Sequence, residues 1–125
     1  MKQTKGKKWL TGLAITGALA GFLAAPVSAD IKDVYKTNCK KCHGWDGKGD
    51  TPQGRKEKAQ NWTDADFQKK VKDSEIVDAI LNGKKEADGR QMKGLKDKVS
   101  EADAKELVKI VRAFAKSPGP FPDEK

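Results

Sequence analysis

Two cysteines and a histidine in one short segment are the residues of this chain best suited to chemistry. They form Cys39-Lys40-Lys41-Cys42-His43, the Cys-x-x-Cys-His pattern of c-type haem attachment. Because residues three apart on a helix share a face, both thiols can reach the two vinyl groups at one porphyrin edge and form thioethers. His43 follows directly, so its imidazole can reach the iron. The pattern predicts one haem c, covalently attached through Cys39 and Cys42 and ligated by His43.

Three other kinds of site contain paired cysteines and are alternatives to haem attachment. A structural disulfide is possible in an oxidising compartment, but it leaves the adjacent histidine unexplained. A thioredoxin-like redox pair would lie near a βαβ pattern, which the sequence lacks. A zinc site normally needs four Cys, His or carboxylate ligands, and the chain has two cysteines and one histidine.

The sixth iron ligand follows by elimination. His43 is the only histidine, and Met1 and Met92 are the only methionines. A methionine opposite the histidine is usual in cytochromes c and raises the reduction potential. Met92 lies between Gly89 and Gly94 in a predicted loop, which favours iron ligation over the alternative of a gap-filling core methionine. A five-coordinate iron would instead indicate gas binding.

The N-terminal segment, residues 1–29, has the organisation of a secretory signal peptide. Four lysines precede an apolar stretch over residues 10–25, Pro26 breaks it, and Val27-Ser28-Ala29 supplies small residues for cleavage. The apolar stretch is short for a membrane span, although an uncleaved anchor is the alternative. We therefore expect a periplasmic protein without stable membrane insertion.

Composition limits the remaining chain to one small domain. The segment 1–29 holds four lysines and no acid, so residues 30–125 keep a modest net charge of +4. No basic stripe alternates with aromatics, which argues against nucleic-acid binding. Leu, Ile, Val and Phe make up only about a sixth of residues 30–125, so a haem would have to complete the core. We expect a monomer.

Apolar periodicity predicts an all-α fold with about four helices and two long loops. The helices are expected over about residues 30–42, 63–71, 73–83 and 100–116, and the loops over 44–61 and 83–99. The third helix should bury Ile76, Val77, Ile80 and Leu81. The last should bury Ala104, Leu107, Val108, Val111, Phe114 and Ala115. A proline-rich tail over residues 117–125 cannot continue it.

These segments resemble the class I c-type cytochromes, especially small bacterial monohaem ones. Residues 34–49 are similar to the attachment segment, and residues 92–116 to the distal ligand loop and C-terminal helix. The resemblance covers about residues 30–116. It implies a cytochrome c fold wrapped around one covalently bound haem, with the first and last helices crossing beside it, and a one-electron carrier with redox protein partners. With His43 and Met92 on the iron, no substrate reaches the metal, so we expect no enzymatic activity.

The family resemblance and residue chemistry suggest two supporting residues. A ligating histidine usually donates its other N–H to a carbonyl or carboxylate, and by resemblance the Pro52 carbonyl is the expected acceptor. Trp62 could donate its indole N–H to a haem propionate. For Trp62 and Trp45 the alternative is simple packing on the haem edge.

The chain departs from the family after the distal methionine, where relatives often have proline and a nearby aromatic. Lys93 and Leu95 stand here instead. The loop lacks proline's stiffness, so we expect a weaker bond between Met92 and iron.

Docking and assembly leave several interpretations open. Eight lysines lie in segments expected to flank the haem and could steer the protein to an acidic partner: Lys40, Lys41, Lys48, Lys84, Lys85, Lys93, Lys96 and Lys98. The alternative is an ordinary solvated lysine surface. Two other functions remain possible, a haem subunit of a larger respiratory complex and an open-site haem protein that binds gas or acts like a peroxidase.

Overall fold

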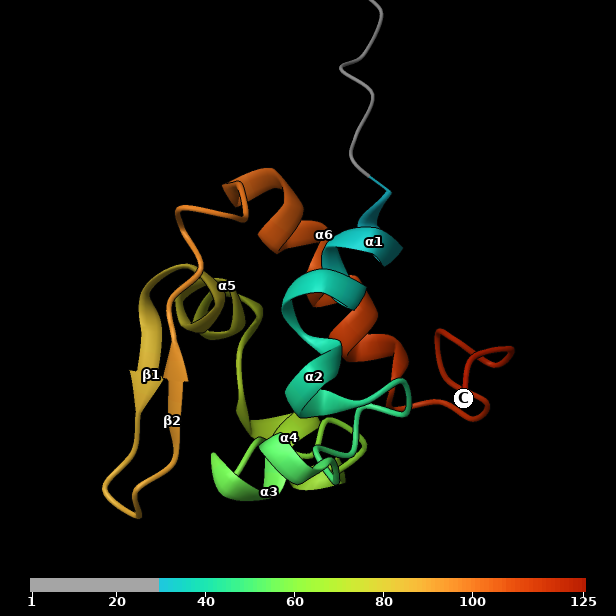
Figure 1. Cartoon of the computed structure of the whole chain (residues 1–125), viewed down its shortest axis with the longest axis horizontal. Helices are drawn as coiled ribbons and strands as arrows, with labels where there is room; N and C mark the ends of the chain where they lie inside the picture. Colours follow the sequence, from blue (N-terminus) through green and yellow to red (C-terminus); the bar gives the residue numbers. More distant parts are fainter. Residues whose placement is uncertain (1–29) are drawn as a thin grey trace, which may run out of the picture.

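The computed structural model describes residues 30–125, in which helices α1, α5 and α6 pack together and a small hairpin stands beside α5 (Figure 1). The elements in that part of the chain are α1 (Ile31–Asn38), α2 (Lys40–His43), α3 (Pro52–Lys56), α4 (Ala65–Lys70), α5 (Asp73–Asn82), β1 (Gly83–Lys85), β2 (Gln91–Lys93) and α6 (Glu101–Ala113). None of the described helices is long and apolar enough to cross a membrane. The proposed signal peptide, residues 1–29, lies outside the described residues.

The predicted first helix is present but divided at Cys39. Asp30 caps α1, because its side chain accepts a hydrogen bond from the Lys32 N–H. Cys39 has φ −116° and ψ −42°, and this φ is far more extended than that of a regular α-helix. The chain then resumes as the short α2, which ends at His43.

Both predicted long loops contain regular structure that the sequence pattern did not reveal. The first holds α3, which Thr51 caps and Pro52 opens at a position that suits proline. The second holds the antiparallel pair β1–β2, in which Lys84 pairs with Met92. The predicted helical fold is therefore present, with one small sheet that the sequence pattern did not indicate. Such short strands cannot show an alternating pattern.

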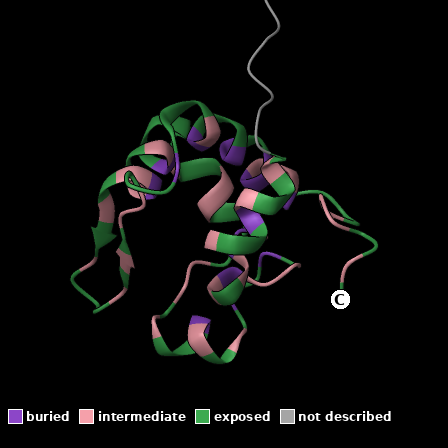
Figure 2. Ribbon diagram, turned by 45° about the horizontal axis from the view of Figure 1, so that its top comes forward, coloured by how far each residue is buried: buried purple, intermediate pink, exposed green. Residues whose placement is uncertain are grey.

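The core lies between α1, α5 and α6, and purple buried positions gather on their facing sides in Figure 2. The predicted apolar face of α6 is buried from Ala104 to Phe114, and Ile110 joins it. Ala115 is exposed, because α6 ends at Ala113. On α5 only Ile76 and Ile80 are fully buried.

The C-terminal tail folds back onto the domain. The Phe121 ring lies 4.8 Å from the Tyr35 ring and 5.2 Å from the Trp45 ring, between centroids. Lys32 and Glu124 form an ion pair that ties the end of the tail to α1. The tail therefore covers one end of the aromatic core.

Candidate functional site

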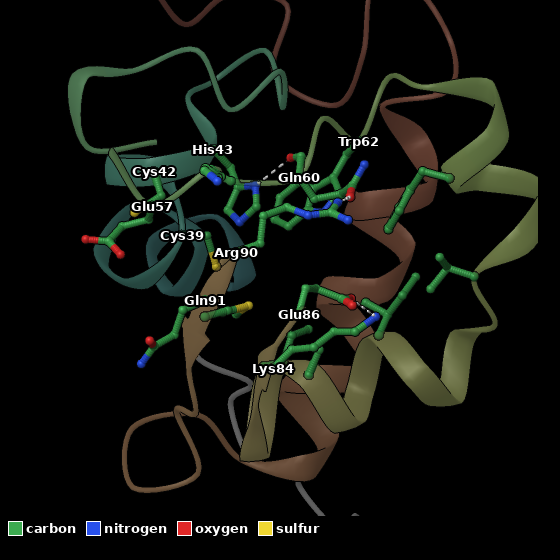
Figure 3. Close-up of a pocket in the computed structure, with 18 of the residues that line it drawn as sticks. Cys39, Cys42, His43, Glu57, Gln60, Trp62, Lys84, Glu86, Arg90 and Gln91 are labelled. Atoms are coloured by element: carbon green, nitrogen blue, oxygen red, sulfur yellow. Dashed lines mark hydrogen bonds and ion pairs between the residues drawn. The ribbon is translucent and has the colours of Figure 1, made fainter. Parts of the chain in front are cut away.

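A cavity of about 810 Å³ brings most of the predicted site residues together. Cys39, Cys42, His43, Trp62 and Met92 all line it. Figure 3 shows the two thiols and the His43 imidazole facing the same space. The volume is within the range of cofactor sites, so the fold joins the attachment segment to a methionine that lies far along the sequence.

Part of the remaining wall is apolar. Side chains from α4, α5 and the segment after β2 contribute it: Phe67, Val71, Ile76, Ile80 and Leu95. Such a wall suits the flat apolar body of a porphyrin, which would complete the sparse core.

His43 is held in the tautomer that a metal requires. Its Nδ1 lies 3.1 Å from the Gln60 carbonyl oxygen. A carbonyl can only accept, so Nδ1 carries the proton and Nε2 keeps its lone pair. Burial lowers the pKa of His43 to about 4, although the Gln60 hydrogen bond opposes that shift. The imidazole is therefore neutral at pH 7 and able to ligate iron.

The Gln60 carbonyl takes the place expected for Pro52. Pro52 is exposed at the start of α3 and does not line the cavity. The hydrogen-bond acceptor for the His43 N–H is therefore not Pro52 but a residue at the far end of the same loop. The sequence contained no signal for Gln60, because every residue carries a backbone carbonyl.

The two thiols differ in burial, since Cys39 is buried and Cys42 is half-buried, but both environments favour the protonated form. Burial raises the pKa of Cys39 to about 12, and the neighbouring Cys42 adds to that shift. Burial also raises the pKa of Cys42. Reactive redox cysteines instead have a lowered pKa, so the environment argues against a thioredoxin-like pair. Both cysteines are free in the structure.

A close backbone approach fixes the attachment segment. The Thr51 hydroxyl lies 2.7 Å from the Lys41 carbonyl oxygen and 3.0 Å from that of Cys42, and it accepts from the Gly54 N–H. A Cβ built on Gly54 would lie 2.2 Å from the Cys42 carbonyl oxygen and 2.3 Å from that of Gly49. Only glycine allows α3 to pack this tightly on α2.

The hairpin positions Met92 at the cavity. At its base the Leu95 N–H donates to the Ile80 carbonyl at 2.8 Å. Gly94 lies so close to α5 that a Cβ would be 2.6 Å from the Leu81 carbonyl oxygen. Met92 is half-buried on β2, where it lines the cavity and also packs against the edge of the hydrophobic core.

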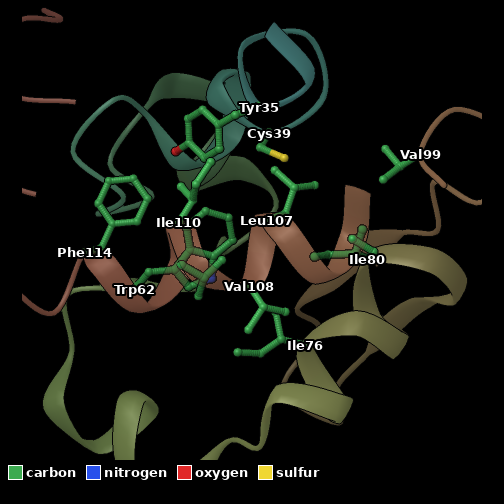
Figure 4. Packing of buried hydrophobic residues seen from close by; sticks show 12 residues of the cluster. Tyr35, Cys39, Trp62, Ile76, Ile80, Val99, Leu107, Val108, Ile110 and Phe114 are labelled. Atoms are coloured by element: carbon green, nitrogen blue, oxygen red, sulfur yellow. The ribbon is translucent and has the colours of Figure 1, made fainter. Parts of the chain in front are cut away.

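Trp62 occupies the boundary between the cavity and the core (Figure 4). Its carbonyl accepts from Gln68 Nε2, which also reaches the Val111 carbonyl of α6. Arg112 in turn donates to the Gln68 carbonyl and to that of Val71. Gln68 and Arg112 were not predicted, because polar residues on amphipathic helices usually face solvent. Trp62 Nε1 has no hydrogen-bond partner among residues 30–125, which leaves it available to a propionate.

The mouth of the cavity carries mixed charge. Five basic residues line it, Lys58, Lys70, Lys84, Arg90 and Lys93, and four acidic ones, Glu57, Asp66, Glu75 and Glu86. Of the eight lysines proposed for docking, only Lys84 and Lys93 are among them. The positive and negative charges at this rim are therefore nearly equal in number. Any positive field would come from lysines that do not line the cavity.

The residues present fit a covalently attached haem. The cavity offers two thiols for thioethers, a neutral imidazole, a thioether on another element and an apolar wall. When bound, haem supplies reversible one-electron chemistry at iron.

Comparisons with known proteins agree with this site. The family model for cytochrome c matches residues 28–113. The fold is similar to a solved structure described as KustC0563 c-type cytochrome, with 34% identity and a TM-score of 0.58 over 70% of this chain and 100% of that one. It is also similar to a tyrosine-to-phenylalanine mutant of Kustc0563, with 32% identity and a TM-score of 0.59 over 69% of this chain and 99% of that one. No curated protein matches the chain. This chain belongs to the cytochrome c family, whose members bind haem c covalently and generally carry electrons.

Proposed function

We propose that the chain is an exported one-electron carrier in which Cys39 and Cys42 hold one haem and His43 and Met92 ligate its iron. The observation that carries the proposal is the meeting of these four side chains at one cavity. His43 presents Nε2 because Nδ1 is engaged by Gln60. Met92 approaches from the hairpin, a separate element.

The protein contributes to electron transfer by keeping the residues around the haem in fixed positions. The attachment segment is fixed by Thr51 and Gly54, and the distal side by the base of the hairpin. With His43 and Met92 both holding the iron, a change of its charge would need little rearrangement of the chain, which favours electron transfer over catalysis. Residues 1–29 would direct the chain to the periplasm, where its partners are redox proteins.

The test is to make the full chain in cells that attach haem c. Intact mass should equal residues 30–125 plus one haem, with neither cysteine open to alkylation. The ferric protein should show the weak long-wavelength absorption band of methionine ligation. Two alkylatable thiols in the haem-containing protein would refute the attachment.

Met92→Ala tests the distal ligand and the open-site alternative together. It should abolish the methionine band, lower the reduction potential and let added ligands bind directly. An unchanged ferric spectrum would show that Met92 is not a ligand, and the open-site haem protein would then be the better assignment.

Docking to an acidic partner is a separate part of the proposal. The exposed lysines outside the rim, such as Lys41 and Lys48, would steer association. Electron-transfer rates with an acidic partner should then fall as ionic strength rises. Rates independent of salt would remove the docking claim and leave the carrier function standing.

A further inference from the structure

Two hydrogen bonds join the outer end of the β1–β2 hairpin to the segment before Trp62. Arg90 Nη1 donates to Gln60 Oε1 at 2.7 Å, and Lys58 Nζ donates to the Asp88 carbonyl oxygen at 2.7 Å. Both ties join segments that are distant in the sequence. In Figure 3 the Arg90 side chain extends across the cavity toward Gln60. We call the pair Arg90–Gln60 the hairpin latch.

The hairpin needs such a contact because few of its own side chains are buried. Of its strand residues only Gly83 and Met92 are even partly buried. A two-stranded hairpin in water is marginally stable at best. The backbone bonds at its base, from Leu95 to Ile80 and from Lys96 to Leu81, hold one end only. The outer end of the hairpin depends on its contacts with residues 58–60.

Asp88 orients the Arg90 side chain for its contact with Gln60. Its Nε lies 2.9 Å from Asp88 Oδ2, and the Asp88 side chain also accepts from the Arg90 N–H. The guanidinium is thereby oriented before it reaches Gln60, which lowers the entropy lost in making the contact. A half-buried charge-assisted hydrogen bond is stronger than a neutral one on the surface.

Gln60 contacts both ligand-bearing elements. Its backbone carbonyl holds His43, and its side chain holds Arg90, which shortly precedes Met92. The two contacts use different atoms, so a side-chain substitution at Gln60 removes the second and keeps the first.

We propose that Arg90 and Gln60 are positioning residues that keep the hairpin closed over the cavity, and that breaking their contact lets Met92 leave the iron and a small external ligand enter. This inference rests on the proposed His43 and Met92 ligation. The latch would compensate for the proline that is missing after Met92. An alternative role for Arg90 is to pair with a haem propionate, in which case Gln60 would not share its effect.

The test measures entry of imidazole into the ferric haem protein by stopped-flow absorption. At saturating imidazole the rate is set by hairpin opening rather than by ligand concentration. Arg90→Ala and Gln60→Ala should each raise that limiting rate about fivefold, the effect of losing one net hydrogen bond. The double variant should be no faster than either single variant, since both remove one contact.

Arg55→Ala is the matched control. Arg55 forms an exposed ion pair with Asp50 and does not line the cavity, so its loss should leave the rate unchanged. Equal melting temperatures of the variants and the wild type would separate a local effect from general destabilisation.

The outcomes are distinguishable. A normal methionine band with an unchanged limiting rate in Arg90→Ala would overturn the latch alone. A raised limiting rate in Arg90→Ala with an unchanged rate in Gln60→Ala would also overturn the latch and would assign Arg90 to the propionate. Additive effects in the double variant would overturn it as well, because they would show that the two residues act through separate contacts. A wild-type protein without the methionine band would refute the axial ligation, and the latch with it.

Discussion

The Trp62 indole lies face to face with the His43 imidazole. Their ring centroids are 3.6 Å apart and their planes differ by 8°. Together with the hydrogen bond to the Gln60 carbonyl, this stack fixes the rotation of the histidine ring. The direction in which Nε2 points is therefore set by the protein without a metal.

Replacing Trp62 should therefore affect both stability and the iron. Trp62→Ala removes a side chain that is only 7% exposed, and we expect a loss of about 3 kcal/mol in the free energy of unfolding. Trp62→Phe keeps a stacking ring and should cost less than about 1.5 kcal/mol. It also removes the indole N–H, so a changed reduction potential with little change in stability would support a bond to a propionate.

Chemical denaturation and potentiometry of the haem protein give the two readouts. Trp45→Phe is the control, because Trp45 is half-buried and does not line the cavity. Wild-type stability in Trp62→Ala would contradict the role given to the stack.

Gly54→Ala should destabilise the attachment segment. The added Cβ would meet the carbonyl oxygens of Cys42 and Gly49, and backbone atoms cannot turn aside as a side chain can. We expect a loss of about 1–3 kcal/mol, the usual cost of overpacking, measured by thermal or denaturant unfolding. Lys56→Ala, at an exposed position of the same helix, should change stability by less than about 0.5 kcal/mol. Equal stability of the two variants would show that α3 can move away from α2.

Alkaline pH should replace Met92 by a lysine. A lysine amine binds iron only when neutral, and its free pKa is about 10.4, so higher pH favours the exchange. Three lysines follow Met92 closely in the sequence, namely Lys93, Lys96 and Lys98, and of these Lys93 lines the cavity. The nitrogen donor should lower the reduction potential relative to a thioether.

Absorption spectra across pH provide the measurement. Lys93→Ala should raise the midpoint at which the methionine band disappears by about one pH unit, equivalent to about 1.4 kcal/mol. Lys96→Ala should leave the midpoint in place. A reversal of that order would assign the exchange to Lys96.

Acid pH should loosen the C-terminal tail. The hydrogen bond and charge of Lys32 lower the pKa of the Glu124 carboxyl. A group with a lowered pKa stabilises the folded state above its ordinary pKa, and the effect is lost as pH falls through the lowered value. The pair is exposed, so the effect is small.

Melting temperatures of the wild type and Glu124→Gln should therefore differ at neutral pH and converge in acid. Asp123→Asn should have a smaller effect, since Asp123 acts on Lys32 through its charge without a hydrogen bond. A difference that persists unchanged below the ordinary carboxyl pKa would rule out the pair as its cause.

The sequence alone was sufficient to predict the chemistry and most of the helices. The spacing of Cys39, Cys42 and His43 admits few other sites, and the single histidine together with Met92 gives the two proposed axial ligands. Caps such as Asp30 and Ser100 mark helix starts because their side chains bond to nearby backbone groups, a local interaction. Family membership confirms the fold and the haem c that these patterns predicted.

Only the tertiary structure decided how the side chains of the proposed site are held. The acceptor for His43 is a backbone carbonyl, and Gln60 rather than Pro52 supplies it because of where the loop passes in space. The contact between Arg90 and Gln60 and the approach of Gly54 to Cys42 join residues through distances that no local pattern encodes. Sequence spacing specifies groups that act along one helix, whereas packing between separate elements specifies the backbone atoms that orient them.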